Sequence, residues 1–220
     1  RLYPKARLLK EITYDEMMQM ACLGAGVLET RSVELASKYN VPLFLGRALE
    51  KDKSRGTWIM EKTKHLEDMP ITGISIKDDY AIMRINDLPT DGVFIARLFA
   101  MIARLNIKLD TISQQLSEEG RVNFSFYCNE EQSEQILEHS EELGEEYSIT
   151  RMLGFIKLSL IGVGISTHSG IASKVFDPLN ANGIRYYMIT SSEISISLTI
   201  EKKDREKAIR VLGDAFDLGV

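Results

Sequence analysis

Apolar and polar residues alternate along much of the chain from Ile71 onward. The segments "ITGISIK" (71–77) and "YAIMRIN" (80–86) alternate with the period of two that is typical of β-strands, and a turn is expected between them at Asp78–Asp79. Residues 93–105 instead carry apolar side chains at a spacing of 3.6, which predicts a helix with one buried face. The pattern therefore predicts strands and helices in alternation.

The segments that follow extend this order. We expect strands at 108–116 and 121–128, a helix with an acidic solvated face at 130–143, and a strand at 148–153. Together with the strand at 80–86 and the helix at 93–105, the order is strand, helix, strand, strand, helix, strand. This is a ferredoxin-like βαββαβ unit of an α+β fold.

A second unit of the same kind begins after the first. Strands at 155–162, 185–191 and 194–200 alternate with helices that end near Gly183 and Phe216. At an offset of 77 residues, Arg97 falls on Lys174 and Phe99 on Phe176, so the helical unit is repeated. The second unit lacks its last strand, which would leave a sheet edge unpaired. The unassigned strand at 71–77 can fill that place, which predicts that the first repeat is inserted into the second.

The first 65 residues form a separate small α/β piece. Thr13 and Glu16 have the spacing of a capping box at the start of a helix that Gly24 ends. A second helix is expected at 32–39, strands at 41–49 and 57–60, and a polar linker at 61–70. The predicted domains are therefore 1–65, 78–153 for the first repeat, and 71–77 with 154–220 for the second.

Composition excludes several classes of protein. The 220 residues are 44% apolar and 27% charged, with a net charge of −5, which disfavours a nucleic-acid surface. An RNA-binding domain of the same strand order would also need a basic face, and the pattern around Phe124 and Phe126 is not that of such domains. No apolar run is long enough for a membrane span and no signal peptide opens the chain, so a cytoplasmic protein without membrane contact is expected.

The two cysteines and the three histidines predict neither a disulfide nor a metal site. Cys22 and Cys128 stand far apart without a CxxC spacing, so two buried free thiols are expected. The histidines are scattered without metal-ligand spacing. The chain begins at Arg1 rather than Met, which suggests a piece of a longer protein.

Three stretches carry a resemblance to a known family. The segment "ITYDEMMQMACLGAGVLETRSVELASKYNVPL" resembles the end of the kinase domain of aspartokinases. The segments "LIGVGISTHSGIASKVF" and "MITSSEISISLTI" resemble the second ACT domain of the same family, a small module that commonly binds amino acids. The resemblance extends over nearly the whole chain and includes the inserted repeat.

The resemblance implies the following function. Aspartokinases phosphorylate the side-chain carboxylate of aspartate with MgATP, and their ACT domains sense end-product amino acids. For this chain it implies two ACT domains that bind lysine, threonine or both as effectors and form a homodimer. The family's aspartate-binding residues and most of its nucleotide-binding residues are not in the chain, so we expect no catalytic residue, no cofactor, no metal and no activity here. MgATP would be a substrate of the full enzyme, and only Arg1, Gly26 and Val27 match a rim of its site.

The first repeat contains the main candidate site for an effector. Backbone N–H groups at the start of a helix attract anions, so the loop before residue 94 is expected to bind an α-carboxylate. Asp110 can pair with an ammonium group, and glutamines beside it offer both donors and acceptors. The candidate residues are Leu88, Pro89, Thr90, Asp91, Gly92, Val93, Leu109, Asp110, Gln114 and Gln115. The alternatives are an ordinary turn capped by Asp91, a solvated Asp110 and glutamines that only pair strands.

The second repeat contains a weaker candidate site. Its residues are Ser166, His168, Gly170, Ile171, Ser192 and Glu193, next to Ser191. Glu193 can bind an amine or pair across a domain interface. Tyr187, which aligns with Asp110, cannot bind an ammonium group as a carboxylate does. Gly92 stands one position before the residue that aligns with Gly170, so the two loops are expected to differ in shape.

A second function remains open on these residues. Two ACT domains can also form a free-standing amino-acid sensor without a kinase partner. The kinase-like residues 1–65 argue against that alternative, because a sensor does not need them. Which amino acid binds, and whether one or both repeats bind it, is left open by the sequence.

Overall fold

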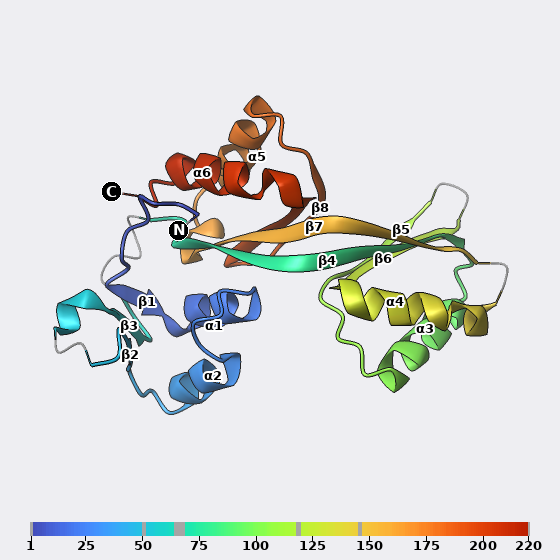
Figure 1. Ribbon diagram of the computed structural model, residues 1–220, viewed down its shortest axis with the longest axis horizontal. Helices are drawn as coiled ribbons and strands as arrows, with labels where there is room; N and C mark the ends of the chain where they lie inside the picture. Colours follow the sequence, from blue (N-terminus) through green and yellow to red (C-terminus); the bar gives the residue numbers. More distant parts are fainter. Residues whose placement is uncertain (1, 50–51, 64–68, 118–119, 145–146, 220) are drawn as a thin grey trace. The chain divides into compact units, whose positions relative to one another are not determined.

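The computed structural model describes residues 2–49, 52–63, 69–117, 120–144 and 147–219 (Figure 1). These residues group into two compact units. The larger unit comprises Arg1–Lys77 and Ile156–Val220, and the smaller unit comprises Asp78–Phe155. Two strands, β4 (Gly73–Leu88) and β7 (Ile149–Ile161), contribute residues to both units.

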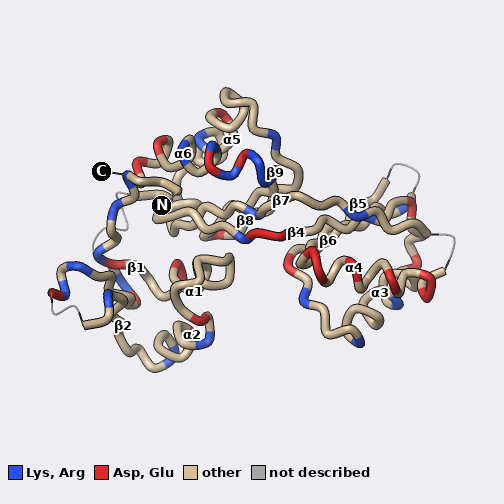
Figure 2. The backbone as a smooth tube through the Cα atoms, in the orientation of Figure 1, with Lys and Arg blue, Asp and Glu red and all other residues tan. Residues whose placement is uncertain are grey.

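The smaller unit has the predicted ferredoxin-like order. After β4 come α3 (Val93–Arg104), β5 (Ile112–Leu116), β6 (Val122–Asn129) and α4 (Glu130–Glu138), and β7 closes the unit. The hydrogen-bonded order of its strands is β5-β6-β4-β7. The two helices bury their apolar faces on one face of these strands, where Met83, Leu98, Phe124 and Ile136 belong to one core cluster. Figure 2 shows acidic positions along α4, as expected for its solvated side.

The second repeat lies in the larger unit. Its elements after β7 are η3 (Val163–Ile165), α5 (Ile171–Ala181), β8 (Tyr186–Ser191), β9 (Ser195–Glu201), η4 (Lys202–Asp204) and α6 (Arg205–Ala215). Its strands are ordered β8-β9-β7-β4. The Thr72 N–H donates to the Ile161 carbonyl at 2.7 Å, so the start of β4 pairs with the end of β7. The predicted fold, in which the first repeat is inserted into the second, is confirmed.

The N-terminal piece of the larger unit has a sheet and a core of its own. It consists of β1 (Glu11–Thr13), α1 (Tyr14–Cys22), α2 (Thr30–Lys38), β2 (Leu43–Leu45), η1 (Lys53–Arg55) and β3 (Thr57–Met60). The strands are ordered β1-β3-β2, and Ile12, Val33 and Ile59 pack together beneath the helices. The predicted capping box is present, because the Thr13 hydroxyl accepts from the Glu16 N–H and Glu16 accepts from the Thr13 N–H.

Two predicted strand boundaries are wrong. Asp78–Asp79 is not a turn, because β4 continues through both residues with only a local left-handed kink at Asp79, where φ is 56°. Residues 148–153 and 155–162 likewise form one strand, β7, and not two. In both places the strand passes from one unit to the other within a single six-stranded sheet, so the chain does not reverse direction.

Three further expectations need correction. The acidic helix predicted at 130–143 ends at Glu138 and tightens into a 3₁₀ turn (η2, Ser140–Leu143) before Gly144, whose φ is 108°. Residues 108–111 do not belong to β5, which begins at Ile112. Cys22 is exposed on the last turn of α1, whereas Cys128 is buried as expected; both are free thiols. Among the described residues no helix is long and apolar enough to cross a lipid bilayer.

Candidate functional site

The start of α3 has the backbone geometry expected of an anion site. Gly92 is the N-cap in a left-handed conformation, with φ at 74°, and Ala96 donates the first intrahelical bond to its carbonyl. The Asp91 carboxylate accepts from the Val93 N–H at 3.0 Å. Of the first-turn donors, the N–H groups of Phe94 and Ile95 therefore remain for a ligand. The predicted cap by Asp91 is therefore present, and the binding of an anion in this loop stays a prediction.

The two repeats begin their first helices in the same way. Gly170 is the N-cap of α5 with φ at 84°, close to the 74° of Gly92. The expected difference in shape is therefore wrong at the N-cap itself, because both positions need the left-handed conformation that glycine adopts without strain. The loops differ in length instead, since Gly162–Gly170 includes the 3₁₀ turn η3.

Strand register decides which candidate residues of the first repeat lie close together. Leu88 on β4 and Leu116 on β5 both pair with Val122 of β6, from opposite sides. Gln115 pairs with Asn123, whose side chain accepts from the Asp87 N–H at 3.1 Å. Because β6 lies between β5 and β4 and neighbouring strands are ~5 Å apart, Gln115 lies two strand spacings, about 10 Å, from the end of β4.

Asp110 lies at the other end of the same strands. Its N–H donates to the carbonyl of Tyr127 at 3.1 Å, and Tyr127 is five positions along β6 from Val122. At ~3.4 Å per residue this separates Asp110 from the level of Leu88 by about 17 Å. A single chain therefore places the glutamines at the same end of the sheet as the loop, and Asp110 at the other end.

Asp110 is exposed, and both oxygens of its carboxylate accept hydrogen bonds from hydroxyl groups. The Tyr80 hydroxyl donates to Oδ2, and the Thr111 hydroxyl donates to Oδ1 at 3.0 Å. A carboxylate offers about four acceptor positions, so it can still accept from an ammonium group. Leu109 beside it packs against the core of the smaller unit, which makes it a supporting residue and not a polar contact.

The candidate residues of the second repeat lie on two neighbouring loops. The Gly162 N–H donates to the Ile194 carbonyl at 3.1 Å, which joins the loop before α5 to the turn between β8 and β9. Ser192 closes that turn through a hydroxyl contact of 2.7 Å with Ser195. Gly170 and the side chains of Ser166, His168 and Glu193 are exposed, whereas Ile171 is buried in the core.

The side-chain chemistry of the described residues gives no metal centre. Among them, no group of three or more His, Cys, Asp and Glu is arranged to hold an ion. His168 directs its Nδ1 to the Gly164 carbonyl at 3.1 Å, which stabilises its own loop.

Comparisons with known proteins identify the family of this chain. Residues 158–216 match the ACT domain family. An aspartate kinase of Pseudomonas putida is 36% identical over 99% of this chain and 54% of its own length. A crystal structure of aspartokinase alpha and beta subunits is 33% identical and has a TM-score of 0.60, and the match covers 67% of this chain and 99% of that one. The chain belongs to the aspartokinase family.

A further structure shows which part of an aspartokinase the chain corresponds to. The regulatory subunit of aspartate kinase from Thermus thermophilus is 26% identical, with a TM-score of 0.61, over 67% of this chain and 99% of its own. The chain spans about half the length of the curated relatives it matches. It corresponds to the regulatory region of an aspartokinase, with two ferredoxin-like ACT domains.

The residues that resemble a nucleotide rim of aspartokinases are only partly described. Arg1 lies outside the described residues. Gly26 and Val27 lie in the loop between α1 and α2, where both are exposed and Gly26 has φ at 64°. Their role in binding a nucleotide stays a prediction.

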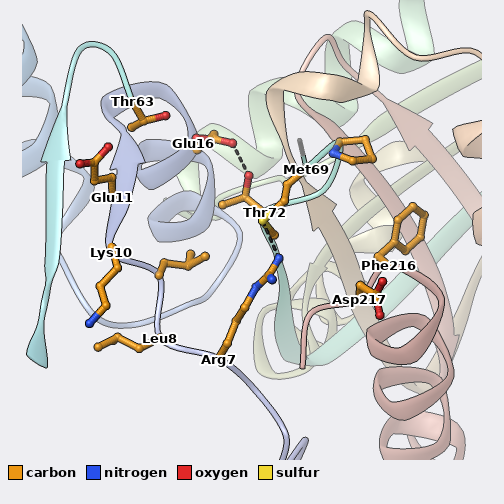
Figure 3. A pocket seen from close by; sticks show the side chains of 12 residues that line it. Arg7, Leu8, Lys10, Glu11, Glu16, Thr63, Met69, Thr72, Phe216 and Asp217 are labelled. Carbon is orange, nitrogen blue, oxygen red and sulfur yellow. Dashed lines mark hydrogen bonds between the residues drawn. The ribbon is translucent and has the colours of Figure 1, made fainter. Parts of the chain in front are cut away.

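The sequence reasoning missed a polar joint in this chain, a set of hydrogen bonds that the Glu16 carboxylate accepts. Glu16 is 2% exposed, and beyond its capping box it accepts from the Thr72 hydroxyl and from the Val163 N–H at 3.4 Å. This carboxylate lines a pocket of about 490 Å³ together with Arg7 and Met69, and Figure 3 shows its hydrogen bond with Thr72. Only the capping half of the joint has a local signal, the spacing of Thr13 and Glu16.

Proposed function

We propose that this chain is the effector-binding region of an enzyme that transfers a phosphoryl group from MgATP to the side-chain carboxylate of aspartate. The effector is lysine, threonine or both, as end products of the pathway that aspartate enters by this reaction. The observation that supports this most directly is the match of 99% of the chain to an aspartate kinase at 36% identity. A free-standing sensor is not favoured, because the N-terminal piece has its own sheet and core.

The first repeat would bind the carboxylate and the ammonium group of the effector at opposite ends of its sheet. The N–H groups of Phe94 and Ile95 receive the α-carboxylate, supported by the field at the start of α3. Asp110 receives an ammonium group, and Gln114 or Gln115 binds the remaining polar atoms. Since these anchors are about 17 Å apart along the strands, a free amino acid is too short to join them within one chain.

A second copy of the chain can supply the other anchor, so that one effector molecule contacts both. In a two-fold pair, the loop at 88–92 of one chain meets Asp110 of the other. The edge strand β5 supports such pairing, because it exposes Ile112 by 48% and Leu116 by 72%. Effector and dimer then strengthen each other by linkage. Sedimentation of the chain with effector should show a dimer, and a monomer at high concentration contradicts the shared site.

Regulation follows from unequal affinity. An effector shifts the enzyme toward an inhibited state only by the difference between its affinities for the two states. The chain by itself has no aspartate kinase activity in this proposal, because the residues that the family uses for aspartate are not among its 220 residues. An aspartyl phosphate signal that depends on MgATP in the purified chain contradicts that part. A cytoplasmic location belongs to the same proposal and agrees with two free thiols.

The decisive experiment is calorimetric titration of the chain with lysine, threonine and methionine, separately and then in pairs. We expect lysine or threonine to bind with a defined stoichiometry. Asp110→Ala should weaken that binding about tenfold to a hundredfold, because it removes a contact to a charged group. Asp177→Ala, on α5 of the other repeat, is the matched control. Absence of binding by all three amino acids contradicts the proposed function.

A further inference from the structure

A tyrosine hydroxyl on the neighbouring part of the sheet holds the proposed ammonium-binding carboxylate. Tyr80 lies on β4 and Asp110 precedes β5, 30 residues later, so β6 separates them in the sheet. The hydroxyl of Tyr80 donates to Oδ2 of Asp110. The contact joins a core residue to an exposed one.

The ring of Tyr80 is fixed before any ligand arrives. Its side chain is 2% exposed, and it packs against Tyr127, whose ring centre lies 5.4 Å away at an angle of 55°. A side chain held this way has already lost its rotational freedom, so it orients a partner without a further entropic cost. The hydroxyl is therefore a preorganised donor.

The hydroxyl also remains a donor over the working range of pH. Burial, and then the hydrogen bond to Asp110, raise the pKa of Tyr80 well above its usual value of 10.0. The phenol stays protonated and donates to the carboxylate. With Thr111 donating to Oδ1, both oxygens of Asp110 accept from hydroxyl groups, which fixes the plane of the carboxylate.

We propose that Tyr80 is a positioning residue that aims the Asp110 carboxylate at the ammonium group of the effector. This rests on the proposed function, because it assigns Asp110 to the effector. Tyr80 itself does not touch the ligand; it sets the direction of the acceptor that does. If Tyr80 only filled the core, its ring would still need to pack on Tyr127, but its hydroxyl would not need a carboxylate as its partner.

The test is a double-mutant cycle measured by calorimetric titration with lysine and threonine. Tyr80→Phe keeps the ring and its packing on Tyr127 and removes only the hydroxyl. We expect it to weaken effector binding about threefold to tenfold, the usual range for one lost hydrogen bond. In an Asp110→Ala background the same change should have no further effect, because Tyr80 acts only through Asp110. Thr111→Val, which removes the other donor, should weaken binding in the same direction.

Tyr187→Phe is the matched control. It also removes a tyrosine–carboxylate bond, from Tyr187 to Glu201 at 2.7 Å, but in the larger unit and on an exposed side chain. It should leave affinity unchanged. If Tyr80→Phe leaves affinity unchanged while Asp110→Ala weakens it, or if the two effects add in full, the positioning role is overturned. A wild-type chain that binds neither amino acid overturns the proposed function and this role together.

Discussion

Glu16 on α1 accepts a hydrogen bond from the backbone N–H of Val163, a residue 147 positions later. The same carboxylate accepts from Thr13 and from Thr72 at the start of β4. One buried side chain thereby connects the N-terminal piece to the loop that precedes α5. Close packing supports the joint, because a Cβ on Gly164 would lie 2.3 Å from the Cα of Pro70.

Glu16→Gln should loosen this joint. The amide keeps one acceptor oxygen and places an NH₂ group among backbone donors that cannot accept from it, so at least one buried N–H loses its partner. We expect a loss of about 1–3 kcal/mol in unfolding free energy, with faster hydrogen exchange at 163–168. Glu34→Gln is the control, since its ion pair with Arg31 is exposed and contributes little. Equal exchange at 163–168 in both variants would show that Glu16 does not stabilise that segment.

Ile71 and Ile85 give a paired test of the inserted topology. Both are fully buried, Ile71 in the core of the larger unit and Ile85 in that of the smaller one. Replacement by Ala should cost about 2–5 kcal/mol in each case, from lost burial and the cavity left behind. Hydrogen exchange should show the loss of protection in β9 for Ile71→Ala and in β6 for Ile85→Ala. The reverse pattern contradicts the assignment of 71–77 to the second repeat.

Asp91 places a negative charge beside the proposed carboxylate site. Asp91→Asn keeps a side-chain oxygen that can accept from the Val93 N–H but removes the charge. Effector affinity should rise about twofold to fivefold, since a charge at a helix terminus contributes about 0.3–1 kcal/mol. Asp87→Asn is the control, because Asp87 pairs with Arg121 outside the first turn of α3. Calorimetry in low salt measures the effector affinity of both variants. Equal changes in affinity would show that the α-carboxylate of the effector does not bind at the start of α3.

The two thiols should differ sharply in reactivity. Burial raises the pKa of Cys128 from 9.0 to about 11, so at pH 8 almost none of it is thiolate, the reactive form. Cys22 is exposed. Iodoacetamide at pH 8 should modify Cys22 first, and mass spectrometry of the Cys22→Ser variant should show a nearly unlabelled chain. Rapid labelling of Cys128 in that variant would show that the core of the smaller unit opens readily.

Local patterns predict the elements well and their long-range partners poorly. The order of strands and helices, the capping box and the inserted repeat follow from periodicity and from counting strands. The continuity of β4 through Asp78–Asp79 does not, because two acidic residues are locally typical of a turn and only pairing with neighbouring strands of the six-stranded sheet keeps the strand extended. The same holds at Gly154 within β7.

The candidate site shows the same limit. The helix that follows Gly92 can be predicted from its apolar spacing, but the matching left-handed N-caps at Gly92 and Gly170 were not predicted. The distance between the loop and Asp110 depends on the register of β5 against β6, which a sequence of alternating residues does not specify to the residue. Glu16 and Tyr80 were missed because their partners are set by tertiary packing and not by spacing.

The exchange of strands between the repeats constrains the order in which the protein can be made. During synthesis residues 71–77 leave the ribosome long before 156–161, the strand beside which they finally pair. The inserted unit, 78–155, is synthesised between these two segments and can fold before the rest of the second repeat has been made. Once folded, it brings its own two ends together and converts a long loop closure into a local one. Folding of the first repeat thus brings together the two strands that the second repeat needs to complete its sheet.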